Sequence, residues 1–330
     1  MVGFREAKVD EYVERMVTTL NVGGVILFDV DVPSESKERN IIDEVQLKKL
    51  IFDLQAISKT PLFVSVNAEG GLINRLKRFI AMPSHKELGG TGDIWNVRAN
   101  ALNLAKELKE FGFNMNFAPV VDIDLNPNNP VIGKLERSFS NDYYLVAEFA
   151  KAFIKAQKEE GIISVVKHFP GHGSSENDSH LGITDVTNTY QKEELYPYQV
   201  LNEESFLDAV MTAHIINKNI DRTYPATLSQ NHINILRDII GFKGVIISDD
   251  MQMKAISDNF GLKESIIKSI NAGCNIILIS NNVNIYDPNL PYKVYQIIVD
   301  AIENKDISKE RIRESLFKIE TLKRAYFMVK

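Results

Sequence analysis

Hydrophobic positions fall into short, nearly continuous runs that alternate with longer segments whose apolar residues recur every three or four positions. Near-continuous β-branched runs are typical of parallel strands buried on both faces, and the longer period is that of amphipathic helices. The predicted strands are Val2–Phe4, Gly24–Phe28, Leu62–Asn67, Asn114–Val120, Ser164–Phe169, Ala209–His214, Gly244–Ser248 and Asn275–Ser280. The predicted helices are Tyr12–Leu20, Gln46–Gln55, Ile94–Phe111, Asp142–Glu160, Gln191–Asn202, Gln230–Ile240, Leu262–Asn271, Tyr292–Asn304 and Lys309–Val329.

This alternation predicts an α/β fold. Eight strands alternating with helices match a (β/α)8 TIM-type barrel that forms one domain over residues 1–330. A doubly wound open sheet would produce the same local alternation. The barrel is favoured by three long loops that all follow strands and therefore meet on one face: Ala68–Asp93, Val121–Asn141 and Pro170–Gln191.

The composition argues against nucleic acid and a membrane as partners. The chain is 44% hydrophobic and 25% charged, with a net charge of −6 and no basic block. These values are those of an ordinary globular protein and do not suit a nucleic-acid surface. No apolar run reaches the length of a membrane span, and the single cysteine, Cys274, excludes an intramolecular disulfide. We expect a monomer with neither a nucleic-acid partner nor a membrane span.

The opening residues, MVGFREAKVDEY, indicate a strand followed by charged positions and contain no signal peptide. This pattern favours the cytoplasm as the compartment. An apolar strand at residue 1, with no helix or cap before it, leaves a periplasmic or secreted protein open if the natural chain starts upstream.

Polar side chains gather where the predicted strands end. Asn67 ends the third strand, Lys167 and His168 stand at the end of the fifth, His214 ends the sixth, and Asp249 follows the seventh. The opposite strand ends carry mostly Gly, Ser, Ala and Leu. Since functional groups of a barrel sit at the carboxyl ends of its strands, we expect the site there.

The loop after the fifth strand, KHFPGHGSSENDSH from Lys167 to His180, holds three of the six histidines. Residues two apart in extended backbone point to the same side, so Asp178 is placed to accept a hydrogen bond from the His180 ring and to raise its pKa. Such a pair suits acid–base chemistry near neutral pH. The alternative is a turn-capping aspartate beside an idle, exposed histidine, and the triplet alone does not separate the two.

Two adjacent carboxylates, Asp249 and Asp250, follow the seventh strand. Neighbouring strand residues point in opposite directions, so one should face the barrel mouth while the other caps the following helix. An ionised carboxylate opposite a histidine acid is able to attack an anomeric carbon. A His–Asp pair would then replace the carboxylic acid that glycosidases usually employ as proton donor.

The same face offers several side chains that are able to ligate a metal. The residues available as ligands are His168, His172, His180, His214, Asp178 and Asp249. They show neither the HExxH nor the HxH spacing of metallohydrolases. The glycine pairs at 23–24, 70–71 and 89–90 match neither a phosphate loop nor a dinucleotide fingerprint. We therefore expect no metal and no cofactor.

Several motifs resemble glycoside hydrolase family three, and more narrowly its single-domain β-N-acetylglucosaminidases that act on peptidoglycan fragments. They are KHFPGHG followed by DSH (Lys167–His180), NPVIG with a downstream ERSF (Asn129–Phe139), AEGGxxxR (Ala68–Arg75), SDDM (Ser248–Met251), GGVILF (Gly23–Phe28) and FAPVVD (Phe117–Asp122). The resemblance spans essentially the whole chain, and the first motif is highly specific. Family-three β-glucosidases usually lack its histidine-bearing loop and carry a second α/β domain.

The resemblance implies a retaining exo-β-N-acetylglucosaminidase that forms a covalent glycosyl–enzyme intermediate. It implies Asp249 as the nucleophile and His180, oriented by Asp178, as the general acid/base. The substrate would be a carbohydrate that contains N-acetylglucosamine. Arg75, Arg137, Lys167 and His168 match the family's sugar-binding positions, and the strand ends add Asn67 and His214 to the expected binding residues.

Asn67 departs from the family pattern, which usually has aspartate there. Its amide oxygen still accepts hydrogen bonds but loses the charge-assisted one, so affinity should fall by about 1–2 kcal/mol or the preferred sugar should differ. The insertion in GKLERSF also bears on where Arg137 lies. Open alternatives are a β-glucosidase or glycoside phosphorylase of the same family, or a sugar-binding pseudoenzyme. The presence of Asp178, His180 and Asp249 favours an enzyme.

Overall fold

The structure, a computed structural model, describes residues 1–283 and 285–327. Seven parallel strands form one curled sheet in the order β1-β2-β3-β6-β7-β9-β11. Their bounds are β1 (Val2–Gly3), β2 (Gly24–Ile26), β3 (Phe63–Val66), β6 (Met115–Asn116), β7 (Ile163–Phe169), β9 (Ala209–Thr212) and β11 (Val245–Ile247). This order follows the chain without a reversal, which excludes the doubly wound sheet and is that of a TIM-barrel-like α/β fold.

The predicted eighth strand, Asn275–Ser280, forms isolated bridges instead of a continuous strand. Ile279 makes a parallel bridge to Val2 of β1, and Ile276 makes one to Ile247 of β11. The Gly3 N–H donates to the Ile279 carbonyl at 2.8 Å, and the Ser248 N–H donates to the Ile276 carbonyl at 3.0 Å. The segment therefore contacts both edges of the seven-stranded sheet.

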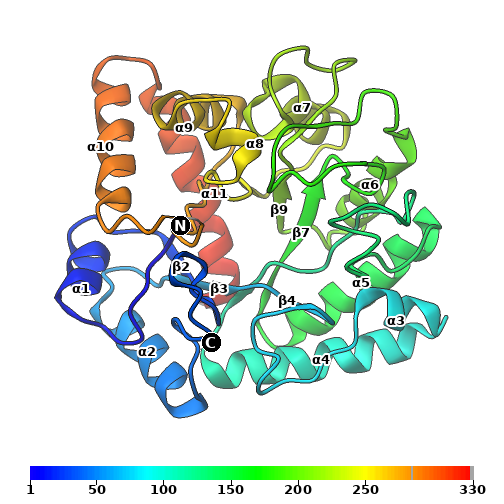
Figure 1. Cartoon of the computed structure of the whole chain (residues 1–330), viewed down its shortest axis with the longest axis horizontal. Helices are drawn as coiled ribbons and strands as arrows, with labels where there is room; N and C mark the ends of the chain where they lie inside the picture. The colour runs from blue at the N-terminus through cyan, green and yellow to red at the C-terminus, as the bar shows by residue number, and fades with distance from the viewer. Residues whose placement is uncertain (284, 328–330) are drawn as a thin grey trace.

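Helices surround the strands (Figure 1). The longer ones are α1 (Glu11–Thr18), α2 (Glu44–Ile57), α4 (Ile94–Phe111), α5 (Tyr143–Glu159), α6 (Tyr196–Glu203), α9 (Leu262–Ala272), α10 (Leu290–Glu303) and α11 (Lys309–Phe327). Short helices α3 (His85–Gly90), α7 (Gln230–Asn234) and α8 (Lys254–Ser257) lie between them. Every predicted helix is confirmed in position, although Val329, the expected end of the last one, lies outside the described residues.

Two predicted helices are divided in the structure. The segment Gln191–Asn202 begins with a 3-10 turn over Lys192–Leu195, and α6 starts after it with Pro197 in its first turn. Proline has no N–H to donate, and it is therefore accommodated at a helix start and not in a helix interior. The segment Gln230–Ile240 is α7 followed by a π-helical turn over Ile235–Ile239.

The sheet separates two apolar layers. Alternate strand residues point to opposite faces, and those on the inner face pack together at the centre of the molecule. The inner layer contains Ile26, Phe28, Phe63, Met115, Phe117, Ile163, Val165, Met211 and Ile247. Helix α11 contributes Leu322 to this layer, and its Phe327 ring lies 5.8 Å from that of Phe63. Helix α11 thereby covers the amino ends of the strands, with a smaller cavity of about 440 Å³ left between it and the starts of β1, β2 and β3.

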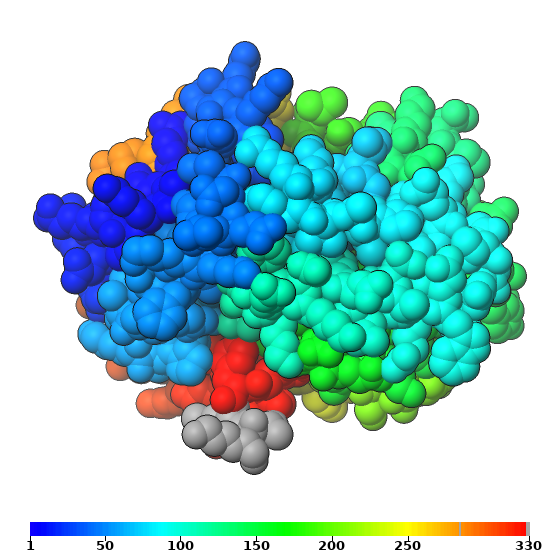
Figure 2. Space-filling view, turned by 90° about the horizontal axis from the view of Figure 1, so that it is seen from below, coloured from blue at the N-terminus to red at the C-terminus, as the bar shows by residue number. Residues whose placement is uncertain are grey.

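The outer layer lies between the sheet and the helices, which follow one another around the molecule. Seen from below, blue, cyan and green segments succeed each other in chain order across the surface, with red α11 at the lower edge (Figure 2). No helix in the described part of the chain is both long and apolar enough to cross a membrane.

Substituting Gly3 tests the contact between β1 and the segment after Ile279. A Cβ on Gly3 would lie 1.9 Å from the carbonyl oxygen of Ser280, whereas a Cβ on Gly23 would meet nothing within 4 Å. We expect Gly3→Ala to lower the free energy of unfolding by about 1–3 kcal/mol. The control Gly23→Ala should change it by less than about 1 kcal/mol. Urea unfolding measures both, and equal values would contradict the close approach.

Candidate active site

A cavity of about 910 Å³ opens at the carboxyl ends of the strands. Phe28, Phe117 and Met211 belong both to its lining and to the inner apolar layer, so the top of the core forms its floor. The predicted site residues that line it are Asn67, Arg75, Arg137, Lys167, His168, Asp178, His180 and Asp249. Residues separated by up to 182 positions in sequence (67 to 249) are thus brought to one cavity.

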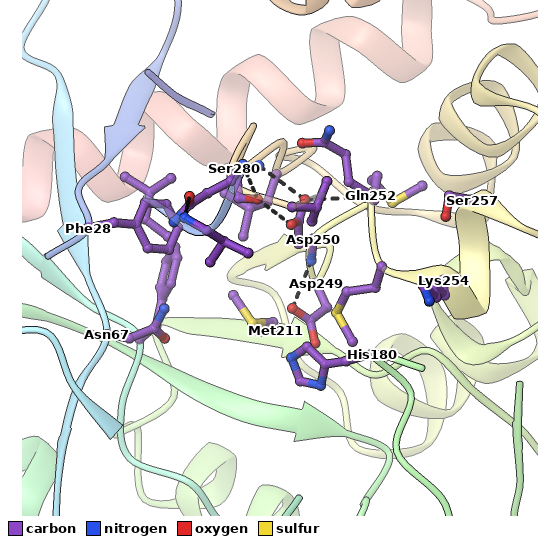
Figure 3. Close-up of a pocket in the computed structure, with 18 of the residues that line it drawn as sticks. Phe28, Asn67, His180, Met211, Asp249, Asp250, Gln252, Lys254, Ser257 and Ser280 are labelled. Carbon is purple, nitrogen blue, oxygen red and sulfur yellow. Dashed lines mark hydrogen bonds between the residues drawn. The ribbon is translucent and has the colours of Figure 1, made fainter. Parts of the chain in front are cut away.

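Asp178 and His180 form the predicted hydrogen-bonded pair. The Nδ1 of His180 lies 2.7 Å from Oδ1 of Asp178, which also accepts the His180 backbone N–H at 2.8 Å. Figure 3 shows the His180 imidazole beside the Asp249 carboxylate. Partial desolvation opposes the charged ring, but the hydrogen bond to Asp178 and the charge of Asp249 outweigh it and raise the pKa of His180. The ring is therefore suited to carry a proton near neutral pH.

Asp249 and Asp250 both line the cavity, so the expectation that only one of them faces the barrel mouth is wrong. The Oδ1 of Asp249 accepts the backbone N–H of Asp250 at 2.7 Å. Burial favours the neutral acid, yet the imidazoles of His214, His168 and His180 together with that N–H lower the pKa of Asp249 below its ordinary value. An ionised carboxylate at the barrel mouth is the state that a nucleophile requires.

Asp250 does not cap a helix as we had predicted. Helix α8 begins after Met253 and has no side-chain cap. Asp250 instead accepts hydrogen bonds from the Ser280 backbone N–H at 3.0 Å, from the Ser280 hydroxyl and from the Gln252 N–H at 3.2 Å (Figure 3). Burial and the charge of Asp249 raise its pKa above the ordinary value. Its role is to join the loop after β11 to the loop after Ile279.

A buried carboxylate, Glu69, organises the cationic side of the cavity. Glu69 lies in β4 (Ala68–Gly70), and its two oxygens accept both the Nε and an Nη of Arg137 at 2.7 and 2.8 Å. The Nζ of Lys167 lies 2.6 Å from the same carboxylate. Burial alone would raise the pKa of Glu69, but Arg137 and Lys167 hold it well below its usual range. Three charges that would be costly to bury singly are therefore buried together.

The hydrogen-bond partners of the two cations determine how many donors remain for a ligand. Arg137 also donates to the Val131 carbonyl at 3.2 Å and approaches the Nε2 of His168 at 3.2 Å. Lys167 donates to Oδ1 of Asn67 at 2.8 Å. Guanidinium has five N–H donors and ammonium has three. Within the described residues, each cation thus keeps at least one N–H without a protein partner, and both cations line the cavity.

Asp122 fixes the ring of His168. Oδ2 of Asp122 lies 2.6 Å from Nδ1 of His168, and the backbone N–H of His172 donates to Oδ1 at 2.7 Å. Desolvation opposes the charged form, but these partners lower the pKa of Asp122. With Nδ1 donating to Asp122, Nε2 is the acceptor toward Arg137. His168 lines the cavity as predicted, but its ring nitrogens are engaged within the protein.

Arg75 reaches the cavity from the short hairpin of β4 and β5 (Ile73–Asn74). Its backbone N–H donates to the carbonyl of Asn67 at 2.9 Å, which places it beside the end of β3. Its guanidinium lies 3.6 Å from the buried carboxylate of Asp29, and 31% of its side chain is exposed. Arg75 therefore stands at the rim of the cavity with its charge accessible.

His214 is placed differently from our prediction, because it is buried and does not line the cavity. Its Nδ1 lies 2.8 Å from the Thr227 hydroxyl, and its Nε2 lies 2.9 Å from the Asp250 carbonyl. Both nitrogens are occupied by the protein, so His214 supports the loop that carries Asp249.

Glu69 and Asp122 were missed by the sequence analysis although both lie within motifs used for the resemblance. Glu69 is two residues after Asn67. Side chains alternate along an extended segment, so those of Asn67 and Glu69 are expected on the same side of the chain. Asp122 follows the region predicted as the fourth strand, but it is buried and does not line the cavity. The partners of both residues lie 46–98 positions later in the sequence, at Arg137, Lys167 and His168, and only the fold reveals them.

The possible metal ligands named from the sequence are not arranged as a metal site in the part of the chain that the structure describes. Among residues 1–283 and 285–327, no group of three or more His, Cys, Asp or Glu side chains is placed to hold a metal ion. His172, one of the residues considered, instead makes hydrogen bonds to Ser175 and Ser179.

Comparison with known proteins identifies relatives along the whole chain. Residues 1–322 match the family model described as "Glycosyl hydrolase family 3 N terminal domain". Beta-hexosaminidase A of Pseudoalteromonas piscicida is 32% identical over 93% of this chain and 54% of its own length. Beta-hexosaminidase LpqI of Mycobacterium tuberculosis is 33% identical over 84% of this chain and 70% of its own.

Solved structures give the same result. A family 3 β-N-acetylglucosaminidase from Paenibacillus superposes with a TM-score of 0.90 at 33% identity, covering 99% of this chain and 61% of that one. The structure of M. tuberculosis LpqI has a TM-score of 0.84 at 30% identity, covering 98% and 90%. The chain thus spans only about half the length of the Pseudoalteromonas relative and 61% of the Paenibacillus one.

Removing the charge of Glu69 should destabilise the protein. Glu69→Gln leaves Arg137 and Lys167 buried without a carboxylate, and we expect the free energy of unfolding to fall by about 3–5 kcal/mol. The matched control is Glu159→Gln, which breaks a surface pair with Arg98 at 2.7 Å. That change should be below about 1 kcal/mol. Urea unfolding compares them, and a loss as small as the control's would contradict the proposed importance of the buried network.

The pair of Asp178 and His180 can be tested by titration. Asp178→Asn removes the charged acceptor that raises the pKa of His180, so this pKa should fall. NMR titration of the imidazole resonances measures it, with the buried His232 as an internal reference whose titration should not move. An unchanged His180 pKa would show that Asp178 is not its determining partner.

Proposed function

Because the chain belongs to glycosyl hydrolase family 3, we propose that it hydrolyses terminal β-linked N-acetylglucosamine as a retaining exo-β-N-acetylglucosaminidase. The observation that carries the proposal is the meeting of a proton-carrying pair, Asp178 and His180, with the ionised Asp249 over one cavity. The printed names of the relatives, beta-hexosaminidase and β-N-acetylglucosaminidase, favour N-acetylglucosamine as the sugar.

In the proposed first step, a carboxylate oxygen of Asp249 forms a bond to the anomeric carbon while the bond from that carbon to the leaving oxygen breaks. His180 gives its proton to the leaving oxygen at the same time. The raised pKa of His180 keeps the proton available at near-neutral pH, and the lowered pKa of Asp249 keeps the nucleophile ionised.

In the proposed second step, neutral His180 takes a proton from water, and the water oxygen attacks the anomeric carbon. The bond to Asp249 breaks, so the carboxylate is regenerated and the sugar leaves with its original configuration. Asp178 stays ionised throughout and stabilises the imidazolium that forms in each cycle.

The sugar would be held by the cationic side of the cavity. Lys167 and Arg137 each have an N–H left for hydroxyl or carbonyl oxygens of N-acetylglucosamine, and Arg75 adds a donor at the rim. Asn67 can accept from a hydroxyl, although Lys167 already occupies its oxygen. His168 would act by orienting Arg137, and no step requires a metal or cofactor.

The proposal extends to the closure of the barrel and to the natural source of the sugar. We infer that segment 276–279 serves as the eighth strand of a closed (β/α)8 barrel, because it makes parallel bridges to both β1 and β11. We also infer peptidoglycan fragments as the natural source of the sugar, since the KHFPGHG and DSH motifs resemble enzymes with that substrate. Both the domain organisation and the assembly as a monomer remain predictions.

Replacing the nucleophile tests the proposed reaction. Asp249→Asn should lower the release of a chromophore from an aryl β-N-acetylglucosaminide by at least about 1,000-fold, because no glycosyl–enzyme bond forms. The control Asp238→Asn, at an exposed position on the outer surface, should keep full activity.

Full activity of Asp249→Asn would contradict the proposal. The native protein should also be assayed with and without phosphate and with an aryl β-glucoside. Dependence on phosphate, with a sugar 1-phosphate as product, would indicate a phosphorylase, and preference for the glucoside would indicate a β-glucosidase. Binding of N-acetylglucosamine without turnover of any glycoside would indicate a pseudoenzyme.

A further inference from the structure

The residue between the two members of the acid–base pair points the other way, into the protein. Ser179 is 2% exposed, whereas 58% of the His180 side chain is exposed. Ser179 is the only buried residue in the stretch 176–183. The segment is a turn and not an extended strand, because the Leu181 N–H donates to the Asp178 carbonyl at 3.0 Å and the His180 N–H donates to the Asp178 side chain at 2.8 Å. Ser179 is the residue of this turn that is buried in the protein, between the two members of the pair. The position of the pair therefore depends on what holds Ser179.

The imidazole of His172 holds Ser179. Its Nε2 lies 3.0 Å from the Ser179 hydroxyl, and its Nδ1 lies 2.6 Å from the Ser175 hydroxyl. The Ser175 hydroxyl also lies 2.9 Å from the carbonyl of His172. A neutral imidazole with its proton on Nδ1 donates to Ser175 and accepts from Ser179 through Nε2, and the other neutral tautomer keeps both bonds to the serines with their directions reversed. Burial lowers the pKa of His172 to about 4, which keeps the ring neutral at working pH.

The backbone around His172 is itself held firmly. Its N–H donates to Asp122 at 2.7 Å, and its carbonyl accepts from Nδ2 of Asn129 at 2.7 Å. The next N–H, that of Gly173, donates to the buried carboxylate of Glu194 at 3.1 Å. A ring anchored in this way is a fixed point from which a longer loop is positioned. One further bond reaches Ser179, since its carbonyl accepts the N–H of Ala255 at 3.3 Å.

We propose that His172 is a positioning residue for the general acid/base: acting through Ser179, it holds Asp178 and His180 over Asp249. This inference rests on the proposed function. Proton transfer requires the donor within hydrogen-bond reach of the leaving oxygen, and a misplacement of about 1 Å is able to reduce rates by about 100-fold. His172 does not line the cavity, so it acts on the substrate only through the loop.

Substrates with two different leaving groups distinguish a loss of acid catalysis from a general loss of activity. Expulsion of phenol needs a proton, whereas expulsion of 2,4-dinitrophenol does not. His172→Asn keeps an amide near Ser175 but does not extend to Ser179. We expect its kcat/KM to fall by about 10- to 100-fold for phenyl β-N-acetylglucosaminide and by less than about 3-fold for the dinitrophenyl substrate.

Two further variants test the assignment of the contact. His172→Gln places a polar group near the former Nε2 and should recover most of the phenyl activity. Ser179→Ala removes the other partner and should reproduce the selective loss. His232→Asn, which alters a buried histidine outside the cavity, is the control and should leave the ratio of the two rates unchanged. An equal loss on both substrates, or no loss in His172→Asn, would overturn the inference.

A second measurement does not need turnover, so a failure of the proposed function is distinguishable from a failure of this inference. If His172 positions the pair, His172→Asn should loosen the bond between Asp178 and His180 and lower the pKa of His180, as seen by NMR titration. An unchanged titration would overturn the inference even if the native protein hydrolysed the glycosides. Failure to hydrolyse either glycoside, with the titration changed, would overturn the proposed function alone.

Discussion

The cavity depends on one buried carboxylate, that of Glu69, which is shared by Arg137 and Lys167. These three residues come from the hairpin after β3, from the long loop after β6 and from the end of β7. No one of them is stable alone at this depth, because an unpaired buried charge costs several kcal/mol. Their mutual attraction therefore joins three separate parts of the chain at the barrel mouth, and both cations line the cavity.

The two sides of the cavity are built in different ways. The side with Lys167 and Arg137 consists of strand ends and buried ion pairs, so a sugar bound as proposed would meet side chains that are already held by the protein. The side with Asp178 and His180 is an exposed loop with one buried attachment at Ser179. Under the proposed function, the preorganised cationic side would need little reorganisation when substrate binds.

Asn67 alters the electrostatics of the sugar side in a defined way. Within the described residues, Glu69 is the one carboxylate within 4.0 Å of Lys167, and Asn67 contributes a neutral oxygen at 2.8 Å. An aspartate at this position would add a second negative charge beside the same ammonium. The family resemblance implies that the aspartate usually accepts from sugar hydroxyls. Under the proposed function, this neutral amide would bear directly on sugar preference.

The sequence by itself determined the α/β class, seven of the strands, the positions of the helices and the pairing of Asp178 with His180. These properties depend on hydrophobic period and on residues two apart, which are local. Segment 275–280 was predicted as a strand. Whether it pairs with both edge strands of the sheet, β1 and β11, depends on the register between segments that are distant in sequence.

Tertiary structure decided the rest. Asp250 bonds to Ser280, His214 is enclosed by Thr227 and Asp250, and Glu69 and Asp122 acquire their partners only when the strands converge. Each assignment depends on the direction of a side chain toward a partner at least 13 residues away in sequence. The hydrophobic period predicts which face of a strand or helix a residue lies on. Its contact partner is determined by burial and charge pairing, which exist only in the folded chain.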